Sequence, residues 1–192
     1  MKHLPNILSL SRILLAVIFV WCVSQNNLFF IILASLIFIA ASLTDYYDGY
    51  FAKKYSTKSN VGIILDPVAD KVLILSAFFI FVQLRLMEPW MFIIIFVREV
   101  VITLLRFAAI CRGKFLAAER AGKVKTVAQM VAIFLILLTM ILRSSGTLSL
   151  WPAPMVHTWA VLVVFVLWTV VVLTVFSGVS YLWNNRKAIH AA

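Results

Sequence analysis

The chain has 192 residues, of which 64% are hydrophobic, and it carries a formal net charge of +10 at pH 7. A mean hydropathy of +1.07 and apolar runs as long as Val127–Leu142 exclude an ordinary water-soluble globular domain. At about 20 residues per membrane crossing, the length accommodates about six transmembrane helices and no separate soluble domain.

We therefore expect an all-α, polytopic membrane protein in which residues 1–192 form a single integral membrane domain. Only helices and closed barrels satisfy their backbones in lipid, and these runs lack the strict alternation of barrel strands. We expect the first helix to be retained, because Arg12 interrupts it and no small-residue cleavage site follows. The predicted helices are Pro5–Val23, Leu28–Phe51, Val61–Leu84, Trp90–Cys111, Lys123–Leu142 and Val156–Trp183.

Basic residues are concentrated at alternate ends of the predicted helices, and the opposite side has only Arg85 and Arg143. Because lysine and arginine accumulate in cytoplasmic loops, this asymmetry predicts that both termini are cytoplasmic. The basic face would meet anionic headgroups or substrates, and we expect no nucleic-acid partner, since the charges lie at membrane boundaries. The basic residues of this predicted cytoplasmic face are Lys2, Lys53, Lys54, Lys58, Arg112, Lys114, Arg120, Lys123, Lys125, Arg186 and Lys187.

All four aspartates of the chain lie at the predicted cytoplasmic ends of the second and third helices: Asp45, Asp48, Asp66 and Asp70. Residues three or four apart share a helix face, so each pair points one way. A carboxylate near lipid is costly unless a cation or hydrogen-bond partner compensates it, which makes the group a candidate functional site. Four hard oxygen donors suit Mg²⁺ or Mn²⁺ and exclude a thiolate-type site.

From Asp45 to Asp70 the sequence reads D-x-x-D-G-x-x-A-K, eight residues, then G-x-x-x-D-x-x-x-D. This pattern resembles the signature of the CDP-alcohol phosphotransferase family, which has arginine where this chain has Lys53. Lysine keeps the charge but lacks the bidentate guanidinium fork, so we expect a weaker diphosphate contact there. The resemblance implies the family's fold and a membrane enzyme in which an alcohol attacks the β-phosphorus of a CDP-linked lipid and releases CMP.

The resemblance also implies roles for individual positions. Asp45, Asp48 and Asp66 would be metal ligands, and Asp70 would be the general base and a further metal ligand. The residues implied to line the CDP-lipid pocket are Asn6, Gly49, Ala52, Lys53 and Gly62. Asn6 shares one helix face with Ser9 and Arg12; a plain helix start, with an arginine extending to the membrane surface, is the alternative interpretation.

Further basic residues accompany the fourth and fifth predicted helices. We expect Arg98 and Glu99, inside the fourth helix, to form a structural ion pair, whereas Arg106 lies nearer the cytoplasm. Residues 122–129 read G-K-V-K-T-V-A-Q, which places Lys123 and Lys125 where helix N-terminal amides favour an anion. A solvated basic loop is the alternative interpretation of these lysines.

Together these segments are similar to the glycerol-phosphate-specific branch of the family, up to about Ile133. The similarity implies that Arg106, Lys123 and Lys125 bind the phosphate of sn-glycerol 3-phosphate, with CDP-diacylglycerol as donor. It further implies a homodimer among membrane lipids in a bacterial plasma membrane. Beyond Gln129 the match is only in hydrophobicity, and we expect the last helix to face lipid. The remaining alternatives are a cardiolipin synthase, a phosphatidylinositol-phosphate synthase and a cation transporter.

Overall fold

The computed structural model describes residues 4–55, 62–111 and 120–190, and it describes side-chain surroundings for residues 11–43, 71–109 and 122–186. The described part is helical without strands, which confirms the all-α prediction. Its elements are α1 (Leu4–Ser24), α2 (Leu28–Tyr55), α3 (Gly62–Gln83), α4 (Pro89–Cys111), α5 (Arg120–Ser144), the 3-10 helix η1 (Thr147–Leu150) and α6 (Ala153–His190).

Local sequence explains where several helices begin and end. Asn26 adopts a left-handed conformation (φ 49°) after α1, and the Asn27 side-chain oxygen caps α2 by accepting a hydrogen bond from the Phe29 amide at 3.0 Å. Pro89 occupies the first position of α4, where its missing N–H costs nothing. Gly146, at φ 74°, provides the left-handed turn that follows α5.

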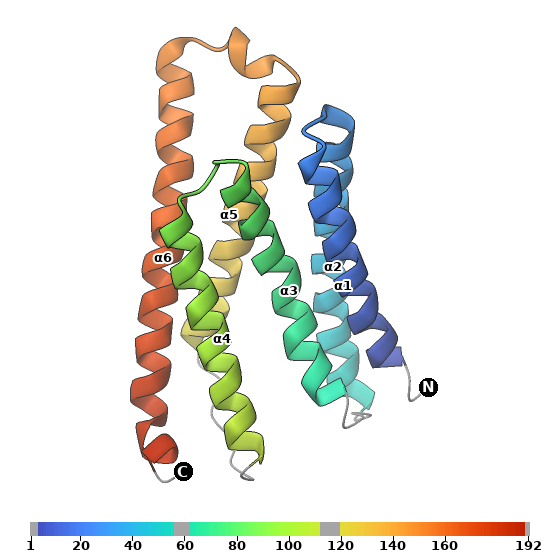
Figure 1. Ribbon diagram of the computed structural model, residues 1–192, viewed down its shortest axis with the longest axis vertical. Coiled ribbons are helices and arrows are strands. Elements are labelled where there is room, and N and C mark those ends of the chain that lie inside the picture. The colour runs from blue at the N-terminus through green and yellow to red at the C-terminus, as the bar shows by residue number, and fades with distance from the viewer. Residues whose placement is uncertain (1–3, 56–61, 112–119, 191–192) are drawn as a thin grey trace. The chain divides into compact units, whose positions relative to one another are not determined.

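Contacts between residues divide the chain into two compact units. The first comprises Met1–Leu86 and Ile136–Trp151, and in it both α2 and α3 pack on α1 (Figure 1). Phe19 of α1 and Phe38 of α2 are buried, with ring centroids 5.9 Å apart. The buried residues of this unit also include Ala16, Ala34 and Ala77, one on each of α1, α2 and α3, and such small side chains permit close helix contact.

The second unit comprises Met87–Leu135 and Pro152–Ala192, and in it α4 packs against α6. Near the start of α4, the rings of Trp90 and Trp168 lie 5.1 Å apart between centroids. Further along α4, Ile95 and Ile102 are buried. This unit also buries charged and polar side chains, and three of them, Glu99, Lys125 and Ser177, belong to the cluster described below.

Two helical segments of the described chain, Gly122–Ser144 and Ala153–Arg186, are long and apolar enough to cross a membrane. Shorter apolar helical segments cover Ser11–Ser24, Leu28–Leu43 and Lys71–Gln83. The number of crossings, about six by sequence, and the single-domain organisation stay predictions.

Candidate active site

The backbone places the four aspartates on neighbouring helices in the chain. Asp45 and Asp48 belong to the second half of α2, and Asp66 and Asp70 belong to the first half of α3. Both pairs thus have the helical spacing on which the predicted metal site depends. The aspartate side chains lie outside the described ones, among which no three His, Cys, Asp or Glu residues come together. The ligand set therefore stays a prediction.

The residues predicted to line the CDP-lipid pocket are also located by backbone only. Asn6 lies in α1, Gly49, Ala52 and Lys53 lie in α2, and Gly62 is the first residue of α3. Their side chains, too, fall outside the described part. Arg12, six residues after Asn6, is described and is only 5% exposed, so its side chain is buried rather than extended to the surface.

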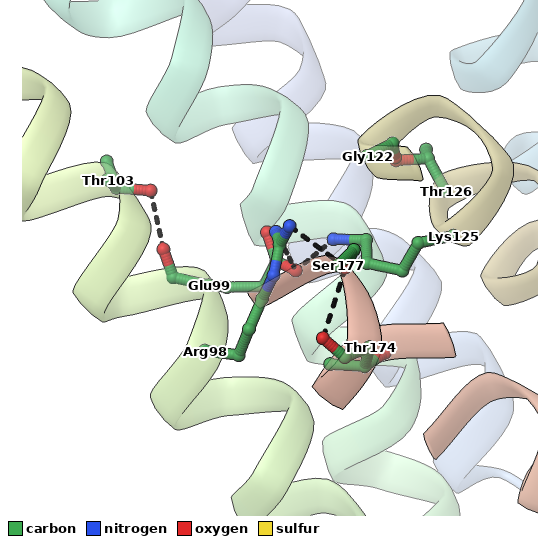
Figure 2. Close-up of polar contacts among 8 residues, drawn as sticks. All are labelled: Arg98, Glu99, Thr103, Gly122, Lys125, Thr126, Thr174 and Ser177. Carbon is green, nitrogen blue, oxygen red and sulfur yellow. Dashed lines mark hydrogen bonds and ion pairs between the residues drawn. The ribbon is translucent and has the colours of Figure 1, made fainter. Parts of the chain in front are cut away.

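A charged cluster lies in the second unit (Figure 2). The Glu99 carboxylate oxygen Oε1 on α4 accepts a hydrogen bond from Nη1 of Arg98 at 3.1 Å and another from Nζ of Lys125 on α5. Glu99 and Lys125 are 4% and 3% exposed. The predicted Arg98–Glu99 ion pair is therefore present, and the structure adds Lys125 to it.

Helix α6 completes the cluster through Ser177. The hydroxyl of Ser177 accepts a hydrogen bond from Nη2 of Arg98 at 3.1 Å and donates one to the Thr174 carbonyl oxygen, also at 3.1 Å. Ser177 is buried, so this contact is shielded from solvent. We call Arg98, Glu99, Lys125 and Ser177 the α4–α5–α6 cluster.

The other two cations predicted to bind the acceptor phosphate have different surroundings. The guanidinium carbon of Arg106 lies 5.6 Å from the ring centroid of Tyr181 on α6, a cation–π arrangement that orients the arginine while leaving it exposed. Lys123, in the first turns of α5, is exposed. All three cations belong to the second unit, and their role as a phosphate site stays a prediction.

Sequence reasoning missed a polar stripe on α6. The residues of this stripe are Thr174, Ser177, Tyr181 and Asn185. All four are buried, and two of them contact Arg98 and Arg106, while the opposite face exposes large apolar residues such as Phe176. Helix α6 therefore has a buried polar face and an exposed apolar face, whereas the sequence predicted a helix that faces lipid. Spacings of three and four between polar residues in an apolar helix were the available signal.

The chain is similar to several known bacterial proteins along nearly its whole length. The chain is 36% identical to the CDP-diacylglycerol--glycerol-3-phosphate 3-phosphatidyltransferase of Bacillus subtilis (strain 168), over 98% of each chain. It is 31% identical to the protein of the same name from Rickettsia felis, over 97% of each. It is 34% identical to a probable phosphatidylglycerophosphate synthase of Mycobacterium tuberculosis, over 97% of this chain and 83% of that one.

Residues 2–176 match the sequence profile of the CDP-alcohol phosphatidyltransferase family. This range contains every residue proposed above for the donor, the metal and the acceptor, and it contains the α4 and α5 members of the charged cluster. The chain belongs to the CDP-alcohol phosphatidyltransferase family, whose members are membrane-integral transferases.

Proposed function

We propose that this chain transfers the phosphatidyl group of CDP-diacylglycerol to the 1-hydroxyl of sn-glycerol 3-phosphate, giving phosphatidylglycerol phosphate and CMP. The observation that carries the proposal is the near-full-length similarity to relatives named for this reaction, at 36% and 31% identity. The cationic residues of the second unit support it, because an acceptor that carries a phosphate dianion needs positive charge where it binds.

On the donor side, Asp45, Asp48, Asp66 and Asp70 would hold Mg²⁺ or Mn²⁺, since carboxylate oxygens are the donors that these ions prefer. When bound, the ion neutralises the diphosphate and the charge that develops on departing CMP. Two glycines and Ala52 would leave room for the nucleotide against the helices, with Asn6 and Lys53 as polar contacts.

The chemical step needs little from the protein beyond positioning and one proton acceptor. The 1-hydroxyl oxygen forms a bond to the phosphorus of the phosphatidyl group, and the bond from that phosphorus to the CMP oxygen breaks. Asp70 accepts the hydroxyl proton. A carboxylate with an ordinary pKa of about 3.9 suffices if the proton departs late, as a loose transition state allows.

On the acceptor side, Arg106, Lys123 and Lys125 would bind the phosphate of sn-glycerol 3-phosphate. Arg106 and Lys123 are exposed and accessible to a soluble substrate, whereas Lys125 is buried beside Glu99. The arrangement supports a site in which the outer cations attract the dianion and the inner one fixes its position.

For the membrane arrangement, we infer a multi-pass protein with about six crossings in the bacterial inner (plasma) membrane, with both termini and the active site cytoplasmic. The distribution of lysine and arginine supports this orientation. The apolar segments Gly122–Ser144 and Ala153–Arg186 support the membrane placement. A homodimer is inferred from family resemblance.

An acceptor panel tests the proposal. Purified protein with CDP-diacylglycerol and Mg²⁺ should release CMP with sn-glycerol 3-phosphate, but not with inositol phosphate or phosphatidylglycerol. Turnover with phosphatidylglycerol would reassign the chain as a cardiolipin synthase, and turnover with inositol phosphate as a phosphatidylinositol-phosphate synthase. Absence of CMP release with every acceptor would leave the transporter alternative.

A further inference from the structure

The Glu99 carboxylate is the link between the helices of the α4–α5–α6 cluster. A single oxygen, Oε1, accepts hydrogen bonds from Arg98 of its own helix and from Lys125 of α5. Both Glu99 and Lys125 are almost fully buried, at 4% and 3% exposure. Burying a carboxylate and an ammonium group costs free energy that an apolar pair would not, so stability alone is a weak reason for this arrangement.

The charge of the cluster suits an anion-binding role. Two cationic groups, the Arg98 guanidinium and the Lys125 ammonium, lie at one carboxylate. Lysine has a flexible four-carbon stem, so an ammonium group aimed at a substrate needs a fixed anchor. It carries three donors, so binding Glu99 is compatible with binding a phosphate oxygen as well.

Helix α6 holds Arg98, which in turn contacts the Glu99 carboxylate. Nη2 of Arg98 donates to Ser177, and the neighbouring Gly178 leaves the space that the arginine stem occupies. A Cβ atom added at Gly178 would lie 3.2 Å from Cγ of Arg98, closer than ordinary van der Waals contact. The Ser177–Gly178 pair therefore determines where Arg98 lies, and Arg98 in turn contacts Glu99.

We propose that Glu99, seated by Arg98 against Ser177 and Gly178, is a positioning residue that aims the Lys125 ammonium group at the phosphate of the acceptor. The proposal rests on the proposed function, since it takes Lys125 as an acceptor-binding residue. Glu99 acts through Lys125, and the carboxylate itself does not contact substrate. Its loss should weaken acceptor use and leave use of the CDP-lipid unchanged.

The first experiment measures KM for both substrates with purified full-length protein, by CMP release. Glu99→Gln should raise KM for sn-glycerol 3-phosphate about tenfold or more, the loss expected for a hydrogen bond to a charged group, with KM for CDP-diacylglycerol unchanged. Glu88→Gln is the matched control, because Glu88 is exposed just before α4, and it should behave as wild type. A wild-type acceptor KM in a folded, active Glu99→Gln protein overturns the proposal.

A double-mutant cycle separates positioning from a merely structural role. Lys125→Gln should raise the acceptor KM, and adding Glu99→Gln should raise it no further. Both changes act on the same interaction, the contact of the Lys125 ammonium group with the acceptor phosphate. Effects that multiply would show that Glu99 acts independently of Lys125 and would overturn the proposal. Failure of wild-type protein to use sn-glycerol 3-phosphate, in contrast, would overturn the proposed function itself.

A variant that leaves every charge in place covers the case in which Glu99→Gln does not fold. Gly178→Ala places a Cβ 3.2 Å from Cγ of Arg98, so the arginine stem must shift by a few tenths of an ångström, and no hydrogen-bonding group is removed. It should raise the acceptor KM while leaving KM for CDP-diacylglycerol unchanged. An unchanged acceptor KM, or an equal rise for both substrates, contradicts the proposal.

Discussion

Lys125 of α5 forms an ion pair with Glu99 of α4 in the second unit, and both side chains are almost fully buried. Arg106, seven residues after Glu99 on the same helix, is exposed and lies over the ring of Tyr181 instead. The cations that sequence reasoning grouped as one phosphate site therefore differ in accessibility. That difference leads to separate expectations for each of them.

Replacing Arg106 with alanine should impair acceptor binding. A charge-assisted phosphate contact is lost, so we expect KM for sn-glycerol 3-phosphate to rise about tenfold or more, without a change in KM for CDP-diacylglycerol. Steady-state CMP release measures both constants. Arg143→Ala is the matched control, since Arg143 is exposed near the end of α5 and should tolerate the change. Equal KM values in the two variants would remove Arg106 from the acceptor site.

Asp70→Asn should stop CMP release and leave binding of the CDP-lipid nearly intact. Asparagine has similar size but cannot accept the hydroxyl proton, so the chemical step fails while the nucleotide contacts remain. Calorimetric titration with CDP-diacylglycerol, together with the activity assay, checks both parts. Loss of binding together with loss of activity would reassign Asp70 as a metal ligand without a base role.

Lys53→Arg should be tolerated or should improve activity. Arginine restores the bidentate fork that the family signature has at this position, and it keeps the positive charge. The measurement is KM for CDP-diacylglycerol in a purified variant that is folded. A folded but inactive variant would count against a diphosphate contact at Lys53.

Removal of divalent metal should abolish CMP release, and Mg²⁺ or Mn²⁺ should restore it. Four carboxylates form a hard oxygen donor set, and the diphosphate needs a counter-ion to depart. Activity is measured after chelation with EDTA and dialysis, then after addition of each ion. Full activity in the chelated protein would contradict the proposed role of the aspartates.

Phe19→Ala should lower the melting temperature of the purified protein by opening a cavity between α1 and α2, where Phe19 lies against Phe38. Comparable truncations in soluble cores cost about 3–5 kcal/mol, and less is expected where the helices face lipid. Val17→Ala is the control, since Val17 is 63% exposed on the same helix. Equal melting temperatures for the two variants would contradict the packing of the first unit.

The sequence predicted the helices well because apolar runs of membrane length are a strong local signal. It was less accurate at helix ends: α6 extends from Ala153 to His190, beyond the predicted Val156–Trp183, and η1 was not anticipated. Both differences reflect end geometry, which hydrophobicity specifies poorly.

The donor-binding residues and the acceptor-binding residues were predictable to different extents. The aspartates and Lys53 could be assigned because rare polar residues at fixed spacing form a recognisable signature. The partner of Lys125 could not, because it depends on how α4, α5 and α6 pack rather than on neighbours in the chain. Ser177 was overlooked for the same reason, although its spacing from Thr174 and Tyr181 is helical.

Isotope tracing of the oxygen that forms the new bond to phosphorus tests the central claim most directly. sn-Glycerol 3-phosphate labelled with ¹⁸O at the 1-hydroxyl is supplied with CDP-diacylglycerol and Mg²⁺, and the products are analysed by mass spectrometry. The account predicts that the label enters phosphatidylglycerol phosphate and that CMP remains unlabelled. Label in CMP, or CMP release without the labelled lipid, would contradict it.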